Sequence, residues 1–201
     1  IRAFLAAEDR TFFEHGGLDY PGIASAILTN LTNSGRPIGA STITQQVAKN
    51  ILLTSEVSYV RKIKEAILAK RIESALTKKE ILSLYLNEIP LGRRTYGVQA
   101  ASQAYFGKDV GDLALHEAAF MAILPKAPET YGREKNAQAA LTRRNWVLGE
   151  MLRNEWISQA QHDAAVAQPL GVMAHQGAQF KPVGGYFIEE VRRQLIDKFG
   201  E

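Results

Sequence analysis

The first residues of the sequence that could do acid–base chemistry are acids placed among aromatic rings. In the stretch AAEDRTFFEHGGLDY, the helical period puts Phe4, Glu8 and Phe12 on one stripe. Burial disfavours the charged form of a carboxyl group, so this position raises the pKa of Glu8 towards neutral pH, where it could act as a general base. Taken alone, the stretch favours a plainer interpretation, a glutamate at the rim of the core that reaches water or an arginine.

A second carboxylate interrupts an apolar pattern in SYVRKIKEAILAKRIESAL. Glu65 shares a helical stripe with Leu68, Ile72 and Leu76. Arg61 lies one turn earlier on the same side, so an ordinary i,i+4 ion pair explains Glu65 if it stands alone. Considered together with Glu8, the catalytic interpretation is as strong as the ion pair.

The segment GASTITQQVAKN lies between these two acids. Ser41 and Thr42 present hydroxyls and free backbone donors at a helix start, where partial positive charge favours a phosphate or another anion. Gln45, Gln46 and Lys49 extend this polar face along the helix. A capped amphipathic helix with exposed amides is the alternative, and the GxxxxGK[ST] order of a Walker loop is absent.

His15 and Asp19 stand four residues apart, a spacing that occurs in metal sites. A structural role is favoured for both. The histidine then anchors the turn around Gly16 and Gly17, and the aspartate caps the next helix.

These residues must be positioned by helices, and sequence patterns typical of helices occur along the whole chain. Asp19 can cap a helix that continues to about Asn33, and three capping boxes mark further helix starts, Thr42 with Gln45, Thr77 with Glu80 and Ser158 with Gln161. Further helices are expected at about 58–76, 95–106, 113–124, 136–154 and 184–198. No segment alternates convincingly as a strand, so the sequence predicts a mainly α fold.

Composition limits the class of protein. The chain has 201 residues, of which 46% are hydrophobic and 22% charged, enough for one sizeable core. The net charge of +3 suits an anionic partner but also an ordinary solvated surface, and the absence of cysteine excludes disulfides and thiolate chemistry. The sequence contains no run of eighteen uninterrupted apolar residues, the length that a helix needs to span a bilayer. The missing signal peptide and initiating methionine suggest a fragment whose start and membrane anchor lie upstream.

Several stretches together resemble a known family. The run EDRTFFEHGGLD, then GASTITQQVAKN, RKIKE and KKEILSLYLNEIPLGRRTYGVQAASQAYFGK, is similar to the ordered motifs of the peptidoglycan glycosyltransferases of family 51, the polymerase domain of class A penicillin-binding proteins. The resemblance continues through EAAFMAILPKAPETYG and RRNWVLGEM and covers about residues 1–170. Residues 171–201 resemble a linker leading towards a transpeptidase domain, and none of that domain's SxxK or KTG signatures is present.

The resemblance implies a lysozyme-like helical domain at the outer, periplasmic face of the bacterial cytoplasmic membrane. Such a domain joins lipid II into glycan strands with inversion at the anomeric carbon and releases undecaprenyl diphosphate. Glu8 matches the family's general base and Glu65 its second catalytic glutamate. The positions that match the diphosphate- and sugar-binding residues are Ser41, Thr42, Gln45, Gln46, Lys49, Arg61 and Lys62, with Asn87 at a further motif position.

Family resemblance also implies the partners. They are lipid II with the growing glycan chain, the membrane surface and moenomycin-type inhibitors. A Mg²⁺ or Mn²⁺ ion would be bound mainly through the substrate diphosphate, because no protein ligand cluster is visible in the sequence. Nucleic-acid binding is not expected, since basic residues are mixed with acids and no recognition motif emerges.

Two other functions remain open at this point. A muramidase or lytic transglycosylase would use a similar fold and an acid glutamate to cut glycan, although the diphosphate-side motif argues against it. A module that binds lipid-linked precursors without turnover is the other alternative.

Two structural expectations follow from the proposed chemistry. A lipid-linked substrate calls for an exposed apolar patch near its groove, and Ile23, Ile27, Leu28 and Leu31 are its expected members. Glu8 should be partly exposed at the floor of a cleft, while Asp9 is turned away to hold the following turn.

Overall fold

Helices make up nearly all of the regular structure in the described residues. The computed structural model describes residues 1–32, 39–52 and 58–174. The helices are α1 (Arg2–Glu8), α2 (Tyr20–Thr32), α3 (Ile43–Val47), α4 (Tyr59–Ala75), α5 (Lys78–Glu88), α6 (Val98–Phe106), α7 (Leu115–Ile123), α8 (Pro128–Tyr131), α9 (Ala137–Arg153) and α10 (Gln159–Val166). Short π or 3₁₀ turns lie at η1 (Ala48–Leu52), η2 (Val110–Asp112), η3 (Leu124–Lys126) and η4 (Glu134–Asn136). Within these ranges the only β-type pairing is an isolated bridge between Pro90 and Tyr96, which confirms the predicted mainly α fold.

The predicted helix starts are confirmed by the side chains that cap them. All three capping boxes are present, with Thr42, Thr77 and Ser158 each accepting a hydrogen bond from the backbone of the residue three positions later. The helix expected at 95–106 begins only at Val98, after Gly97 with a φ of +77°. The helix expected at 184–198 lies outside the described residues.

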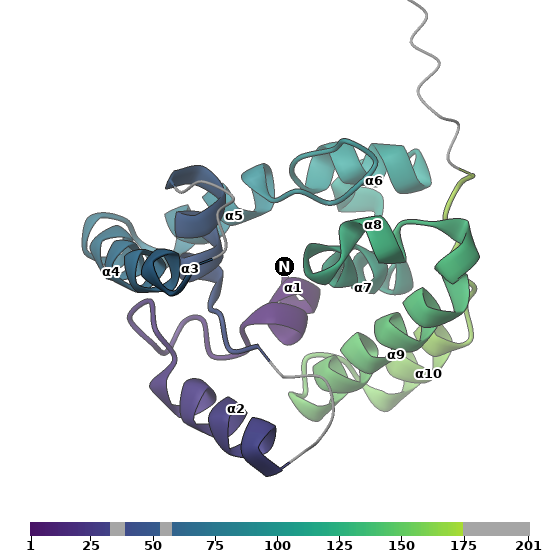
Figure 1. The fold of residues 1–201 in the computed structure, drawn as a ribbon. Coiled ribbons are helices and arrows are strands. Elements are labelled where there is room, and N and C mark those ends of the chain that lie inside the picture. Colours follow the sequence, from purple (N-terminus) through teal and green to yellow (C-terminus); the bar gives the residue numbers. More distant parts are fainter. Residues whose placement is uncertain (33–38, 53–57, 175–201) are drawn as a thin grey trace, which may run out of the picture.

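The core is built around α7. This helix packs against α1 and α9, and its residues Phe120, Met121 and Ile123 are fully buried. In Figure 1, α1 lies at the centre of the molecule, with α3, α4 and α5 on one side and α7, α9 and α10 on the other. The end of α1 is therefore held where these two groups of helices meet.

The predicted stripe of Phe4, Glu8 and Phe12 is wrong at its last position. Helix α1 ends at Glu8, because Asp9 leaves the helical conformation with φ −162° and ψ 80°. Phe12 is nevertheless fully buried, with its ring 4.3 Å from the Lys78 ammonium group. It reaches the core through a turn in which its N–H donates to the Asp9 carbonyl at 3.2 Å.

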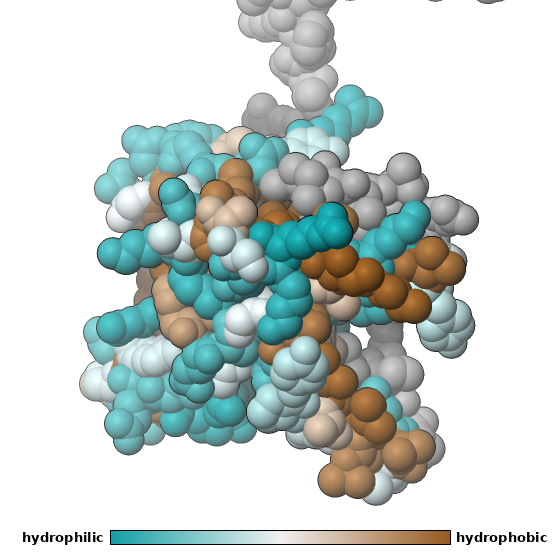
Figure 2. Space-filling model, turned by 90° about the vertical axis from the view of Figure 1, so that its left-hand side faces the viewer, coloured by the Kyte–Doolittle hydropathy of each residue, from teal (hydrophilic) through white to brown (hydrophobic). Residues whose placement is uncertain are grey.

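Helix α2 has no buried residue and carries an apolar surface. Ile27, Leu28 and Leu31 are 56%, 65% and 81% exposed, which confirms the predicted exposed patch, while Ile23 is half-buried. In Figure 2, brown apolar residues gather at the edge of the molecule where α2 projects. No helix in the described ranges is both long and apolar enough to span a bilayer.

A buried arginine ties the last helices together. The Arg144 side chain, on α9, is fully buried and donates to the backbone carbonyls of Val166, Gln168 and Pro169 at distances of 2.8 to 3.1 Å. These carbonyls lie at and beyond the end of α10, where helical partners run out.

We expect the substitution Arg144→Met to lower the free energy of unfolding by about 2–4 kcal/mol, because it removes the buried guanidinium that donates to three carbonyls at the end of α10. Urea denaturation followed by circular dichroism measures this loss. The control is Arg153→Met, which removes an exposed arginine from the same helix and should change stability by less than about 1 kcal/mol. Equal losses for the two variants would contradict this stabilising role of Arg144.

Candidate active site

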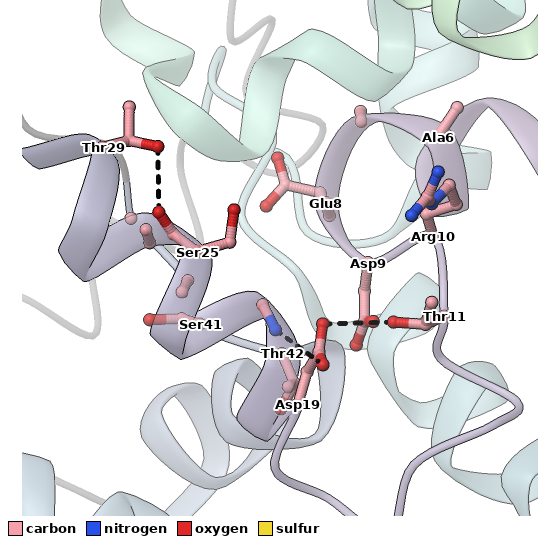
Figure 3. A pocket seen from close by; sticks show the side chains of 15 residues that line it. Ala6, Glu8, Asp9, Arg10, Thr11, Asp19, Ser25, Thr29, Ser41 and Thr42 are labelled. Atoms are coloured by element: carbon pink, nitrogen blue, oxygen red, sulfur yellow. Dashed lines mark hydrogen bonds between the residues drawn. The ribbon is translucent and has the colours of Figure 1, made fainter. Parts of the chain in front are cut away.

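A polar cavity of about 280 Å³ opens between the end of α1, helix α2 and the segment before α3. Figure 3 shows the Glu8 carboxylate extending from the end of α1 towards the space beside α2. The polar residues of its lining are Glu8, Asp9, Arg10, Thr11, Asp19, Ser25, Thr29, Ser41 and Thr42. The cavity thus places the first candidate acid beside the predicted anion-binding segment.

Glu8 is half-buried, as predicted for a base at the floor of a cleft. Its Oε2 accepts a hydrogen bond of 2.8 Å from Gln46 Nε2 on α3. Burial raises the pKa of Glu8 above its ordinary value, and the Gln46 hydrogen bond and the charges of Arg143 and Lys126 partly oppose that rise. The result is a carboxylate with increased proton affinity that still reaches solvent.

Asp9 holds the cavity in shape. Its buried carboxylate accepts a 2.9 Å hydrogen bond from the Ile43 N–H at the start of α3, and His15 Nε2 lies 2.9 Å from its other oxygen. Burial raises the pKa of Asp9, while the hydrogen bonds from His15 and Ile43 act in the opposite direction. The predicted structural role of Asp9 is confirmed.

His15 and Asp19 both make hydrogen bonds within the protein. Asp19 accepts from the Gly22 N–H at 3.0 Å, which caps α2 as predicted, and from the Thr11 hydroxyl at 3.2 Å, a contact that Figure 3 shows. Among the residues that the structure describes, no three His, Asp or Glu side chains gather in a way that could hold a metal ion.

Glu65 lies on the other side of Ser41. It is only 2% exposed, and its two oxygens pair with Arg61 Nε at 3.1 Å and Lys62 Nζ at 2.8 Å. Lys62 Nζ also donates to Ser41 Oγ at 2.8 Å. The i,i+4 ion pair is therefore present, and through Lys62 it is connected to a residue that lines the Glu8 cavity.

The remaining predicted residues divide into two groups. Thr42 and Gln45 are buried in the capping box, and the Thr42 hydroxyl also donates to the Gly17 carbonyl at 2.7 Å. Lys49 is exposed on the π-helical turn η1. Asn87 is exposed near the end of α5, where its amide donates to the Ser83 carbonyl at 2.9 Å, and it does not line the cavity. Their contacts with a substrate stay predictions.

Sequence reasoning missed two positive charges that act on Glu8. Lys126 in η3 and Arg143 in α9 both lower the pKa of Glu8, and the Arg143 guanidinium lies 3.6 Å from the centre of the Trp146 ring. Both are more than one hundred residues from Glu8 along the chain. Their only signal was membership of the stretches AILPKAPETYG and RRNWVLGEM, which carry no local hint of an acid partner.

The site combines a proton acceptor with positive charge. Glu8 can take a proton from a hydroxyl group, and the Lys62 and Arg61 cations can stabilise negative charge on a leaving group. Ser41 joins the two regions through its hydrogen bond from Lys62. This arrangement suits the transfer of a group from an anionic carrier to a hydroxyl.

Comparisons with known proteins agree with this chemistry. The sequence profile of the family described as "Transglycosylase" matches residues 1–152. The chain is 49% identical over its whole length to penicillin-binding protein 1A of Haemophilus influenzae and 47% identical to that of Aquifex aeolicus, and it covers 23% and 27% of those proteins. A crystal structure of the H. influenzae protein matches 79% of the chain and 20% of its own, with 36% identity and a TM-score of 0.49.

The chain spans about a quarter of the length of these relatives. The family profile, in contrast, covers most of the chain, from its first residue through α9 almost to the end of that helix. The chain therefore belongs to the transglycosylase family, the peptidoglycan glycosyltransferases that its motifs resemble.

Proposed function

We propose that this chain polymerises lipid II into glycan strands, with inversion at the anomeric carbon and release of undecaprenyl diphosphate. The observation that carries the proposal is the Glu8 carboxylate, half-buried in a polar cavity that Ser41 also lines. Lys62 donates to Ser41, and the Lys62 and Arg61 cations both pair with Glu65. Membership of the transglycosylase family supports the same reaction class.

In the proposed step, a sugar hydroxyl of the acceptor gives its proton to Glu8 while its oxygen attacks the anomeric carbon of the donor. The new carbon–oxygen bond forms on the face opposite the leaving group, and the bond from that carbon to the diphosphate oxygen breaks. The electron pair leaves with the diphosphate. The raised pKa of Glu8 suits this role, because a stronger base accepts the hydroxyl proton more readily.

The diphosphate is proposed to lie on the Ser41 side of the cavity. Lys62 already donates to Ser41 Oγ, and Arg61 is held beside it by the buried Glu65 carboxylate. Glu65 is thus proposed to orient a cation or donor more than to move a proton. Lys49, exposed on η1, is proposed to bind the same anion from a neighbouring position.

A Mg²⁺ or Mn²⁺ ion fits this site only if the substrate supplies most of the ligands that bind the ion. Of the acids that line the cavity, Asp9 and Asp19 accept hydrogen bonds from protein groups on both oxygens, whereas Gln46 donates only to Oε2 of Glu8. Glu8 Oε1 would therefore be the carboxylate oxygen that a metal ion could use. An ion of this kind uses substrate phosphates for its remaining positions and supplies charge stabilisation there.

The surface that carries α2 is proposed to face the outer leaflet of the cytoplasmic membrane. Gly22, Ser25, Ala26 and Thr29 of this helix line the Glu8 cavity, while Leu28 and Leu31 are exposed. A lipid-linked substrate could therefore stay in the bilayer while its sugars reach Glu8. Moenomycin-type inhibitors are proposed to compete for the same cavity.

The direct test of this function is incubation of the protein with labelled lipid II and separation of the products by length. Polymers of increasing length support the proposal. Degradation of added glycan would identify a lytic enzyme instead, and binding of lipid II without turnover would identify a recognition module.

We expect Glu8→Gln to slow polymerisation by at least about 10²-fold, because general-base catalysis typically contributes 10²–10⁴-fold. Affinity for lipid II should stay within about tenfold. The activity of the parent protein should fall as the pH decreases through the raised pKa of Glu8, since the base must be unprotonated.

The control for this experiment is Glu14→Gln, which neutralises an exposed acid that does not line the cavity. It should polymerise lipid II at the parent rate. Thermal melts establish that both variants are folded. A folded Glu8→Gln protein with more than a tenth of the parent rate would remove Glu8 from the catalytic role.

Glu65→Gln should also slow polymerisation severely without unfolding the domain, because Arg61 and Lys62 lose the anion that orients them. The matched control is Glu73→Gln on the same helix, which loses an ion pair of 2.7 Å with Lys78. Turnover of lipid II is measured beside the thermal melt of each variant. Near-normal turnover of Glu65→Gln would reduce Glu65 to a structural ion pair.

We expect the protein to float with liposomes that contain anionic lipids. Leu28→Ser combined with Leu31→Ser should weaken this association more than about tenfold, because burying each leucine contributes about 1.5–3 kcal/mol. Leu84→Ser with Val110→Ser removes exposed apolar side chains outside α2 and serves as the control. Recovery of all parent protein in the aqueous fraction would contradict the membrane-facing surface.

A further inference from the structure

A tight turn between α5 and α6 holds two arginines in an unfavourable backbone conformation. The Thr95 N–H donates to the Gly92 carbonyl at 2.8 Å, and the two residues between them, Arg93 and Arg94, have φ values of +50° and +58°. Positive φ at both central residues is the pattern of a type I′ turn, which strongly prefers asparagine and glycine. Such strain in residues other than glycine persists where the surroundings or a function require those side chains.

These arginines line a second cavity, of about 310 Å³, which is large enough for a small ligand. The turn, Tyr105 of α6 and the region of α8 form its walls. The walls are closely packed, because a Cβ atom at Gly92 would lie only 2.7 Å from the Tyr105 hydroxyl. The Tyr105 hydroxyl itself donates to the Leu91 carbonyl at 2.9 Å. The side of the cavity that Gly92 and Tyr105 form is therefore closely packed.

Arg93 forms a rigid part of this wall. Its guanidinium lies 4.2 Å from the centre of the Tyr105 ring and donates to the carbonyls of Ala104 at 2.6 Å and Met173 at 2.7 Å. Its Nε is buried and has no hydrogen-bond partner. Its terminal nitrogens are occupied by protein carbonyls, so Arg93 fixes the wall against which a ligand would lie.

The other arginines of the cavity are available to a ligand. Arg94 is exposed and forms no hydrogen bond or ion pair with any residue in the described ranges. Arg133 pairs with Glu129 at 3.4 Å, but both side chains are exposed and such a pair is weak. With Arg93, Arg94 and Arg133 against Glu129, the lining has an excess of positive charge. Guanidinium groups match carboxylates in geometry as well as in charge.

Helix α8, which lines the second cavity, and helix α1, which ends at Glu8, both pack against α9. Lys126 is near enough to Glu8 to act on its charge, and Pro128, two residues later, lines the cavity. Two residues span at most about 7 Å of extended chain. A substrate whose sugar is at Glu8 could therefore place another of its groups at this cavity.

We propose that the Arg93–Arg94–Arg133 cavity binds a carboxylate of the peptide that the sugar substrate carries. This inference rests on the proposed function, because that function supplies a substrate with a peptide attached to its sugar. The peptide extends past Lys126, and Arg94 and Arg133 hold its carboxylate at the mouth of the cavity. The site thus selects for the charge of the peptide, independently of the transfer reaction at Glu8.

The first test measures binding and needs no turnover. An acetylated tripeptide with free side-chain and C-terminal carboxylates is titrated by NMR, and the same peptide with both carboxylates amidated is the comparison. The parent protein should bind only the acidic peptide. Arg94→Asn should weaken this binding about fivefold while melting at or above the parent temperature, because asparagine suits the turn.

Two further variants keep this test decisive. Arg133→Gln, at the other side of the cavity mouth, should also weaken binding of the acidic peptide. Arg71→Gln removes one positive charge from an exposed position on α4 and should bind like the parent. Binding by folded Arg94→Asn that equals the parent, or equal binding of the acidic and amidated peptides, would overturn the proposal.

The second test separates this inference from the proposed function. With lipid II that carries free peptide carboxylates, Arg94→Asn should raise KM about fivefold and leave kcat unchanged. With amidated lipid II it should change neither constant. A parent protein that distinguishes the peptides but does not polymerise lipid II would overturn the proposed function alone. A polymerising parent with no carboxylate-dependent effect of Arg94→Asn would overturn the cavity assignment alone.

Discussion

The buried Asp9 carboxylate is the constraint on which the arrangement of the site depends. It ends α1 one residue after Glu8 and accepts the Ile43 N–H at the start of α3, so segments 34 residues apart are joined at one point. Gln46, one turn into α3, then reaches the Glu8 carboxylate. A buried carboxylate without hydrogen-bond partners would destabilise the fold, so the positions of the Ile43 N–H and of His15 are as constrained as those of core residues.

Sequence reasoning succeeded where the deciding interactions are local. The capping boxes and the Asp19 cap depend on residues three positions apart, and each was found where it was predicted. The same reliance on local pattern predicted a helical stripe that continued to Phe12, whereas α1 ends at Glu8. It could not show that Asp9 would leave the helix to accept a hydrogen bond from Ile43, a contact that only the folded chain creates.

The electrostatic surroundings of Glu8 could not be predicted from the sequence. Residues far along the chain supply Lys126 and Arg143, and nothing near them in the sequence indicates an acid partner. The strained turn at Arg93 and Arg94 was missed for a different reason. Propensity places asparagine or glycine in such turns, so two arginines in succession gave no turn signal.

Helix α2 has a consequence for dynamics. A helix of 13 residues without a buried side chain gains little from tertiary packing, and isolated helices of this length are only marginally stable in water. Its backbone amides should therefore exchange with deuterium far faster than those of α7, whose residues fill the core. Any environment that covers Leu28 and Leu31 would slow that exchange, so the order of α2 depends on its surroundings more than on the rest of the protein.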